Sequence, residues 1–153
     1  MSSPEARLAD LGIELPAVVP PVAVYVPAIR SGSYVYTSGQ LPMVDGALVR
    51  TGKVGAEVDA DTAKDLARTC ALNAIAAVKS VVGELSAVTR VVKVVGFVAS
   101  APDFTGQPQV INGASELLGE VFGEAGRHAR SAVGVAVLPR DAPVEVEIIV
   151  EVG

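Results

Sequence analysis

Two ionisable residues near the end of the chain have the placement best suited to chemistry. Arg130 stands at the entrance to the apolar run 131–135, SAVGV. A guanidinium there can hold a carboxylate through two parallel hydrogen bonds, whereas the plainer interpretation is a surface arginine at a strand end. Glu145 lies within the last apolar run, where it can act as a base, orient a water molecule, or simply face solvent. Spacing alone favours the plainer interpretation of both residues.

Five further residues attract attention by type and position. Tyr25 and Ser38 fall on the first β-like segments, where packing and turn roles are open alternatives. Asn112 interrupts an apolar helical run, so it either orients a strand-borne residue or is a surface amide. His128 is expected to be an exposed loop histidine rather than a catalyst. Cys70, among alanines in a helical pattern, is expected to be a small buried hydrophobe.

Composition excludes several classes of function. The 17 acidic residues outnumber the 12 basic ones, giving a net charge of −5, whereas nucleic-acid binders cluster Lys and Arg against phosphates. One cysteine and one histidine exclude a disulfide framework, a multi-cysteine metal site and a histidine pair within one chain. No phosphate-loop or zinc motif occurs, so we expect neither cofactor nor metal. Without a signal-peptide pattern or a membrane-spanning run, we expect a cytoplasmic protein.

The N-terminal part of the chain is expected to be a helix followed by strands. Ser3 and Pro4 are typical of a helix start, and the prolines that follow predict an extended arm, so 1–21 is an N-terminal extension. Residues 22–41 have a β pattern broken by a turn at 31–33. Asp45-Gly46 then predicts a hairpin turn before a third strand. Residues 22–153 form a single domain.

The remaining chain predicts two helices and three strands. A helix begins at Asp59 or Asp61 and runs to residue 82, and a second covers 108–122. Strands cover 88–100, 130–138 and 144–152; the first is so continuously apolar that burial on both faces is expected. The order βββαβαββ predicts an α+β sandwich with two helices on one face of the sheet. The other face, partly apolar and partly acidic, predicts self-association.

Two segments resemble a known family. The stretch from Tyr34 to Pro42, YVYTSGQLP, resembles the SGQ-[IL]-P strand of the Rid proteins, the reactive-intermediate deaminases. These proteins are also called YjgF-type proteins or L-PSP endoribonucleases. The run Arg130-Ser131-Ala132-Val133 with Leu138-Pro139 and 144–147, VEVE, is similar to their C-terminal signature. Asn112 falls where the family has a VNxxYxxFF-like helix, and the similarity covers about 22–152.

The resemblance implies a fold, an assembly and a reaction. The fold is the chorismate-mutase-like α+β fold, in a homotrimer whose sheets line a central barrel and whose clefts between subunits hold small acids. The reaction is hydrolysis of an enamine or imine, such as 2-aminoacrylate via 2-iminopropanoate, to a 2-keto acid and ammonia. The alternative is a non-catalytic protein of the same fold that binds or senses a small carboxylate. The net acidic charge disfavours the endoribonuclease interpretation.

The resemblance also implies roles for individual residues. Arg130 would grip the substrate carboxylate, and Glu145 would position the attacking water. The residues that would line or brace the cleft are Tyr25, Ser38, Gly39 and Asn112. Ala132 takes the place of a cysteine that is common in the family, so any contribution of this position would come from its backbone.

Overall fold

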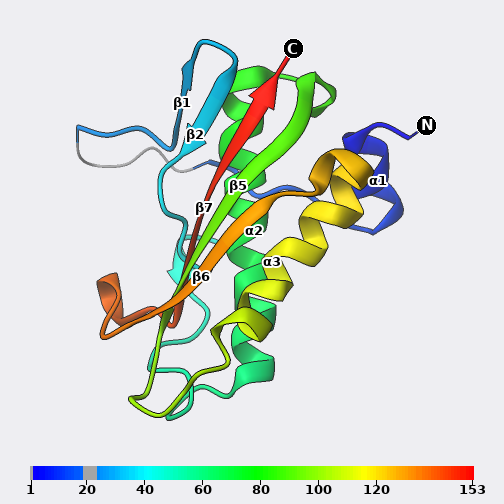
Figure 1. The fold of residues 1–153 in the computed structure, drawn as a ribbon. Helices are drawn as coiled ribbons and strands as arrows, with labels where there is room; N and C mark the ends of the chain where they lie inside the picture. Colours follow the sequence, from blue (N-terminus) through cyan, green and yellow to red (C-terminus); the bar gives the residue numbers. More distant parts are fainter. Residues whose placement is uncertain (1, 19–23) are drawn as a thin grey trace.

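A computed structural model describes residues 2–18 and 24–153, which form a mixed sheet with helices packed on one face (Figure 1). The five strands lie in the order β1-β2-β7-β5-β6. They are β1 (Ala28–Ser31), β2 (Tyr34–Thr37), β7 (Val144–Val152), β5 (Val88–Ala99) and β6 (Ala129–Val135). Only β5 and β6 pair in parallel, because the helix between them carries the chain back to the same end of the sheet. The predicted α+β class is confirmed.

The two long helices begin and end where the sequence predicts. Helix α2 (Ala60–Val82) begins after Asp59, whose carboxylate accepts a 2.7 Å hydrogen bond from the Thr62 N–H. It ends at Gly83, where φ is +83°, a conformation that glycine adopts without strain. Helix α3 (Gln107–Phe122) carries Pro108 in its first turn.

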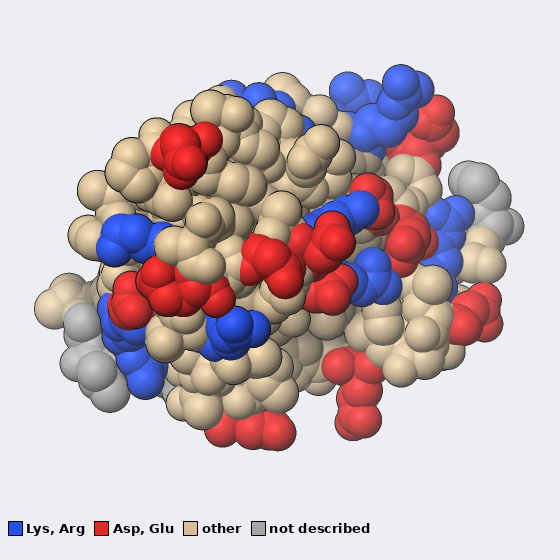
Figure 2. All heavy atoms as spheres, turned by 90° about the horizontal axis from the view of Figure 1, so that it is seen from below, with Lys and Arg blue, Asp and Glu red and all other residues tan. Residues whose placement is uncertain are grey.

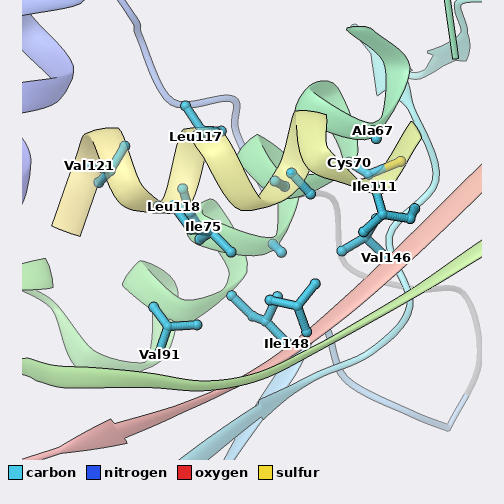
Figure 3. Packing of buried hydrophobic residues seen from close by; sticks show 14 of the residues in the cluster. Ala67, Cys70, Ile75, Val91, Ile111, Leu117, Leu118, Val121, Val146 and Ile148 are labelled. Carbon is cyan, nitrogen blue, oxygen red and sulfur yellow. The ribbon is translucent and has the colours of Figure 1, made fainter. Parts of the chain in front are cut away.

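The core lies between these helices and the sheet (Figure 3). Five apolar residues of α3 that recur at helical spacing are fully buried: Val110, Ala114, Leu117, Leu118 and Val121. Cys70 of α2 is fully buried, as predicted, and burial raises the pKa of its thiol well above the ordinary value. Val81, near the end of α2, is 37% exposed. The two helices approach closely at Gly113, where any side chain would collide with the Lys64 carbonyl.

The two faces of the sheet have different surroundings. On β7, Val144, Val146 and the alternate residues that follow are buried against the helices, whereas Glu145, Glu147 and Ile149 face the other side and are partly exposed. The prediction that β5 is buried on both faces is therefore wrong for the single chain. The helices cover one face only, and strand alternation leaves the other face open.

The first strands differ from the prediction. Residues 22 and 23 lie outside the described part of the chain, and 24–27 precede the sheet, because β1 begins only after Pro27, which has no N–H to donate to a ladder. Strands β3 (Met43–Val44) and β4 (Ala47–Leu48) form a separate hairpin. Its turn at Asp45-Gly46 has positive φ at both residues, as the sequence predicts.

Strand β6 is shorter than predicted. It ends at Val135, which pairs with Ala99, the last residue of β5. As an edge strand with a single neighbour, β6 has no ladder partner beyond that point, and the short 3₁₀ turn η3 (Pro139–Asp141) follows.

The N-terminal helix α1 (Pro4–Asp10) packs against the main body. Ser3 caps it, as predicted, through a 3.1 Å bond from the Ala6 N–H, and Leu8 is buried. The Glu5 carboxylate accepts from Lys79 Nζ at 2.9 Å and from the Leu85 N–H at 2.6 Å. Residues 13–18 of the predicted arm have no regular structure. In the described part of the chain, no helix is both long and apolar enough to span a membrane.

Glu5 should make stability depend on pH. Burial raises the pKa of this carboxyl, but the Leu85 N–H and the Lys79 ammonium lower it by more, so the pKa lies below the ordinary value of 4.5. A lowered pKa in the folded state stabilises the fold above the unfolded value, and this contribution is lost as pH falls through the folded pKa. Glu5→Gln should lower the thermal midpoint at pH 7 by roughly 2–4 °C.

The difference between wild type and Glu5→Gln should shrink as pH approaches 4. The matched control is Glu124→Gln, which removes an ion pair with Arg127 whose side chains are 81% and 83% exposed, and it should change little. Scanning calorimetry between pH 7 and pH 3.5 measures both. A difference independent of pH would show that the Glu5 carboxylate contributes nothing by its charge.

Candidate functional site

The guanidinium of Arg130 is held by helix α3. Arg130 lies in β6 opposite Val94 of β5, on the face that the helices cover. Its Nη1 donates to Asn112 Oδ1 at 2.8 Å and to Ser115 Oγ at 3.2 Å. Its Nη2 donates to the Pro108 carbonyl at 3.3 Å. Asn112 thus contacts a strand-borne residue, one of the two alternatives that the sequence left open.

Arg130 keeps hydrogen-bonding capacity for a ligand. Three of the five guanidinium N–H groups have these acceptors, which leaves Nε–H and one Nη2–H without a partner among residues 2–18 and 24–153. Within the same residues, no carboxylate lies at ion-pair distance from Arg130. A partly buried cation with neutral acceptors and two spare donors has the chemistry that binds a carboxylate.

Ser115 and His128 belong to the same group, and the sequence did not predict either. His128 Nε2 lies 2.8 Å from Ser115 Oγ, and His128 Nδ1 lies 2.6 Å from the Gly126 carbonyl. His128 lies in a loop, as expected, but the expected exposure is wrong, because the ring is partly buried and bonded at both nitrogens. A usable signal was present for Ser115, which follows Asn112 by three positions and so shares its helix face.

Ala132 lies on the same face of β6 as Arg130. It pairs with Gly96 of β5 and packs partly buried against the core. Its methyl group offers no hydrogen bond, so only its backbone can contribute to a polar site.

Glu145 and Gly39 form a second group. Glu145 lies in β7 opposite Phe97 of β5, and its carboxylate occupies the space that a side chain at position 39 would need. Glycine at 39 therefore permits this position of the Glu145 side chain. Burial, and to a smaller extent the neighbouring Glu147 carboxylate, raise the pKa of Glu145 above its ordinary value. A carboxylate with a raised pKa is a stronger base than an exposed one.

Ser38 connects this second group to the segment before β1. Its Oγ donates to the Val26 carbonyl at 2.6 Å, and its N–H donates to the Pro27 carbonyl at 2.8 Å. Tyr25 directly precedes this tied segment, and its side chain is 61% exposed.

The two groups lie on opposite faces of the sheet. Val94, opposite Arg130, is fully buried under the helices, and so are Val144 and Val146, which flank Glu145. Because successive side chains alternate, Glu145 points to the open face, and β5 lies between the two strands. A single chain therefore does not bring Arg130 and Glu145 together.

Two hollows on the described chain contain none of the predicted site residues. One of about 460 Å³ lies between residues 14–17, the β3–β4 hairpin and α2, and one of about 330 Å³ lies between α2 and α3. Among the described residues, no cluster of three His, Cys, Asp or Glu side chains could hold a metal ion. Figure 2 shows basic and acidic side chains intermixed on one face of the molecule, without the continuous basic area that binds phosphates.

Known proteins match nearly the whole length of the chain. The family model described as "YjgF/chorismate mutase-like, putative endoribonuclease" matches residues 5–152. Protein TCP17 of Trypanosoma cruzi is 48% identical over 147 residues, which cover 95% of this chain and 92% of that protein. The 2-iminobutanoate/2-iminopropanoate deaminase of Dermatophagoides farinae is 34% identical, with 90% of this chain and 93% of that protein covered.

A solved structure has nearly the same fold over most of its length. The Agrobacterium tumefaciens protein Atu1372, of unknown function, has a TM-score of 0.92 at 50% identity, covering 98% of this chain and 92% of its own. The predicted chorismate-mutase-like α+β fold is thus confirmed. On the extent of these matches, the chain belongs to the YjgF/chorismate mutase-like family.

Proposed function

We propose that the protein hydrolyses small carboxylate-bearing enamines or imines, such as 2-iminopropanoate, to 2-keto acids and ammonia. The observation that carries this proposal is the Arg130 guanidinium, held by neutral acceptors and without a counter-ion among the described residues. The resemblance to a named imine deaminase supports it. We place this activity in the cytoplasm.

The reaction needs few groups because the imine carbon is already electrophilic. Arg130 binds the substrate carboxylate and fixes the imine carbon beside a water molecule, so that positioning supplies much of the rate. Glu145 takes a proton from that water as its oxygen bonds to the carbon of the protonated imine, whose C=N electron pair moves to the nitrogen and gives a neutral carbinolamine. Glu145 then returns the proton to that nitrogen, the C–N bond breaks, and ammonia leaves as the hydroxyl group gives its proton to Glu145 and becomes the keto oxygen.

The remaining residues have supporting roles in this scheme. Asn112 braces Arg130 through the 2.8 Å bond to its guanidinium. Gly39 gives Glu145 its space, and Ser38 fixes the segment that carries Tyr25 at the mouth of the cleft. The backbone at Ala132 lines the Arg130 side.

The cleft in this proposal lies between copies of a homotrimer. Arg130 and Glu145 lie on opposite faces of one sheet, so a second copy must bring an Arg130 to a Glu145. The open face can form such an interface, because it carries the partly exposed Tyr36, Ile149 and Phe97 among its carboxylates.

A second candidate function is non-catalytic binding of a small carboxylate. It is favoured by the Arg130 group, which is complete in a single chain and needs no Glu145. Ammonia release from freshly generated 2-aminoacrylate separates the two functions, because a binder would hold the product 2-keto acid without accelerating its formation.

Glu145→Gln should abolish turnover and preserve binding. The amide keeps the size of the carboxylate but cannot take a proton, so kcat should fall on the order of 10²-fold or more. In wild type, kcat should decline as pH falls through the raised pKa of Glu145, at a higher pH than an ordinary glutamate would give. Glu151→Gln, on the same face of β7, is the matched control. Ammonia release near the wild-type rate in Glu145→Gln would remove the base from this mechanism.

Arg130→Ala should weaken binding and turnover together. Loss of a bidentate charged pair should weaken pyruvate binding by roughly tenfold or more, and Arg130→Lys should restore little, because an ammonium lacks the planar fork. Arg127→Ala is the control, since Arg127 is 83% exposed at its side chain and bonds only Glu124 among the described residues. Calorimetric titration with pyruvate, alongside circular dichroism, measures the effect. Equal affinity in Arg130→Ala and wild type would place the carboxylate elsewhere.

A further inference from the structure

We propose that Ser115 and His128 are positioning residues that orient the Arg130 guanidinium toward the substrate carboxylate. The inference rests on the proposed function, since it assigns Arg130 the carboxylate. It concerns two residues that form a chain of hydrogen bonds from the Gly126 carbonyl through His128 and Ser115 to Arg130.

The direction of each hydrogen bond follows from the first partner. A backbone carbonyl only accepts, so the proton of the neutral His128 ring lies on Nδ1, which is 2.6 Å from the Gly126 oxygen. The bare Nε2 then accepts the hydroxyl proton of Ser115 across 2.8 Å. With its proton engaged, Ser115 Oγ presents lone pairs to Arg130 Nη1 at 3.2 Å.

Without His128, the Ser115 hydroxyl would have other uses. A serine within a helix readily turns its hydroxyl toward the carbonyl four residues earlier, which changes where its lone pairs point. His128 removes this freedom and makes Ser115 a fixed acceptor beside Asn112. Two acceptors on one Nη1 define the plane of the guanidinium, and hence the direction of its two unpartnered N–H groups.

The chain of bonds begins at a tightly packed backbone carbonyl, that of Gly126. Gly126 closes the short 3₁₀ turn η2 (Gly123–Gly126) and packs so tightly on α3 that a side chain there would collide with the Leu118 carbonyl. His128 is therefore held against the helix that carries Ser115. A binding group aligned by such packed elements loses little entropy when the ligand arrives.

The first test measures pyruvate binding by calorimetry in four variants and one control variant. Ser115→Ala and His128→Phe should each raise Kd by roughly three- to thirtyfold, because each removes one link of the same chain. The Kd of the double variant should be no higher than that of the single variant that binds pyruvate less tightly, since the two links act as a unit. Ser115→Thr, which keeps the hydroxyl, should bind nearly as well as wild type. Glu116→Gln, the exposed neighbour of Ser115 on α3, is the matched control.

The second test reads the ring directly, because His128 is the single histidine of the chain. Nitrogen-15 NMR of the imidazole should show a protonated Nδ1 and a bare Nε2 in the neutral ring. Pyruvate should shift the Nε2 resonance in wild type and leave it unchanged in Ser115→Ala. Arg130→Ala should shift the Nε2 resonance even without ligand, since Ser115 Oγ then loses a donor.

The outcomes separate this inference from the proposed function. If wild type binds pyruvate and Ser115→Ala and His128→Phe bind it equally well, the positioning role is overturned and the deaminase proposal stands. A proton on Nε2 instead of Nδ1 also overturns the positioning role.

Ser115 and His128 have the geometry of a nucleophile and its base as well. Covalent labelling of Ser115 by a fluorophosphonate would show that Ser115 is a nucleophile, and this result would overturn the positioning role. If wild type neither binds pyruvate nor releases ammonia, the proposed function fails, and the ligand-free NMR comparison still tests the hydrogen-bonded chain.

Discussion

Successive side chains of a strand point to opposite faces, and in this sheet helices cover only one of the two. This constraint decides where each functional group can act. Arg130 lies on the covered side, so α3 can supply its acceptors. Glu145 lies on the open side, between the buried Val144 and Val146, and reaches Gly39 in the segment that follows β2. The fold therefore builds both halves of the proposed site, the Arg130 group and the Glu145 group, but on opposite faces of the sheet.

The surroundings of Arg130 keep its charge available. A partly buried guanidinium needs hydrogen bonds, and a carboxylate partner would satisfy them while cancelling the positive potential. Here amide, hydroxyl and carbonyl oxygens serve as acceptors, from Asn112, Ser115 and Pro108. They satisfy donors without neutralising the cation, so an anionic ligand still gains the charge-assisted bonds, each worth about 1.5–3 kcal/mol.

Local signals predicted the elements well. Asp59 and Gly83 mark the ends of α2 through capping and positive φ, both of which are encoded by single residues. The parallel edge strand and the burial of β5 were harder to predict, because they depend on which strands pair across the chain. Strand β5 looks buried on both faces from composition, yet only pairing and helix placement show which side is covered.

The candidate site was only partly predictable, because it too depends on how strands pair across the chain. Motifs drew attention to Arg130, Glu145 and Asn112, but the side of the sheet on which each lies follows from register and not from motif. His128 was missed because its partners, Ser115 and the Gly126 carbonyl, come together only when the turn after α3 packs back on that helix. No spacing rule for catalytic motifs describes such a contact.

The central claim is that each working cleft combines Arg130 of one copy with Glu145 of another. Its most direct test mixes two inactive variants, Arg130→Ala and Glu145→Gln, by co-expression or by unfolding and refolding together. In mixed trimers some clefts pair the intact Arg130 of one variant with the intact Glu145 of the other. Random mixing in equal amounts should then restore about a quarter of the wild-type ammonia release. If both residues came from the same chain, every cleft would keep a defect, and a mixture as inactive as its parents would contradict the account.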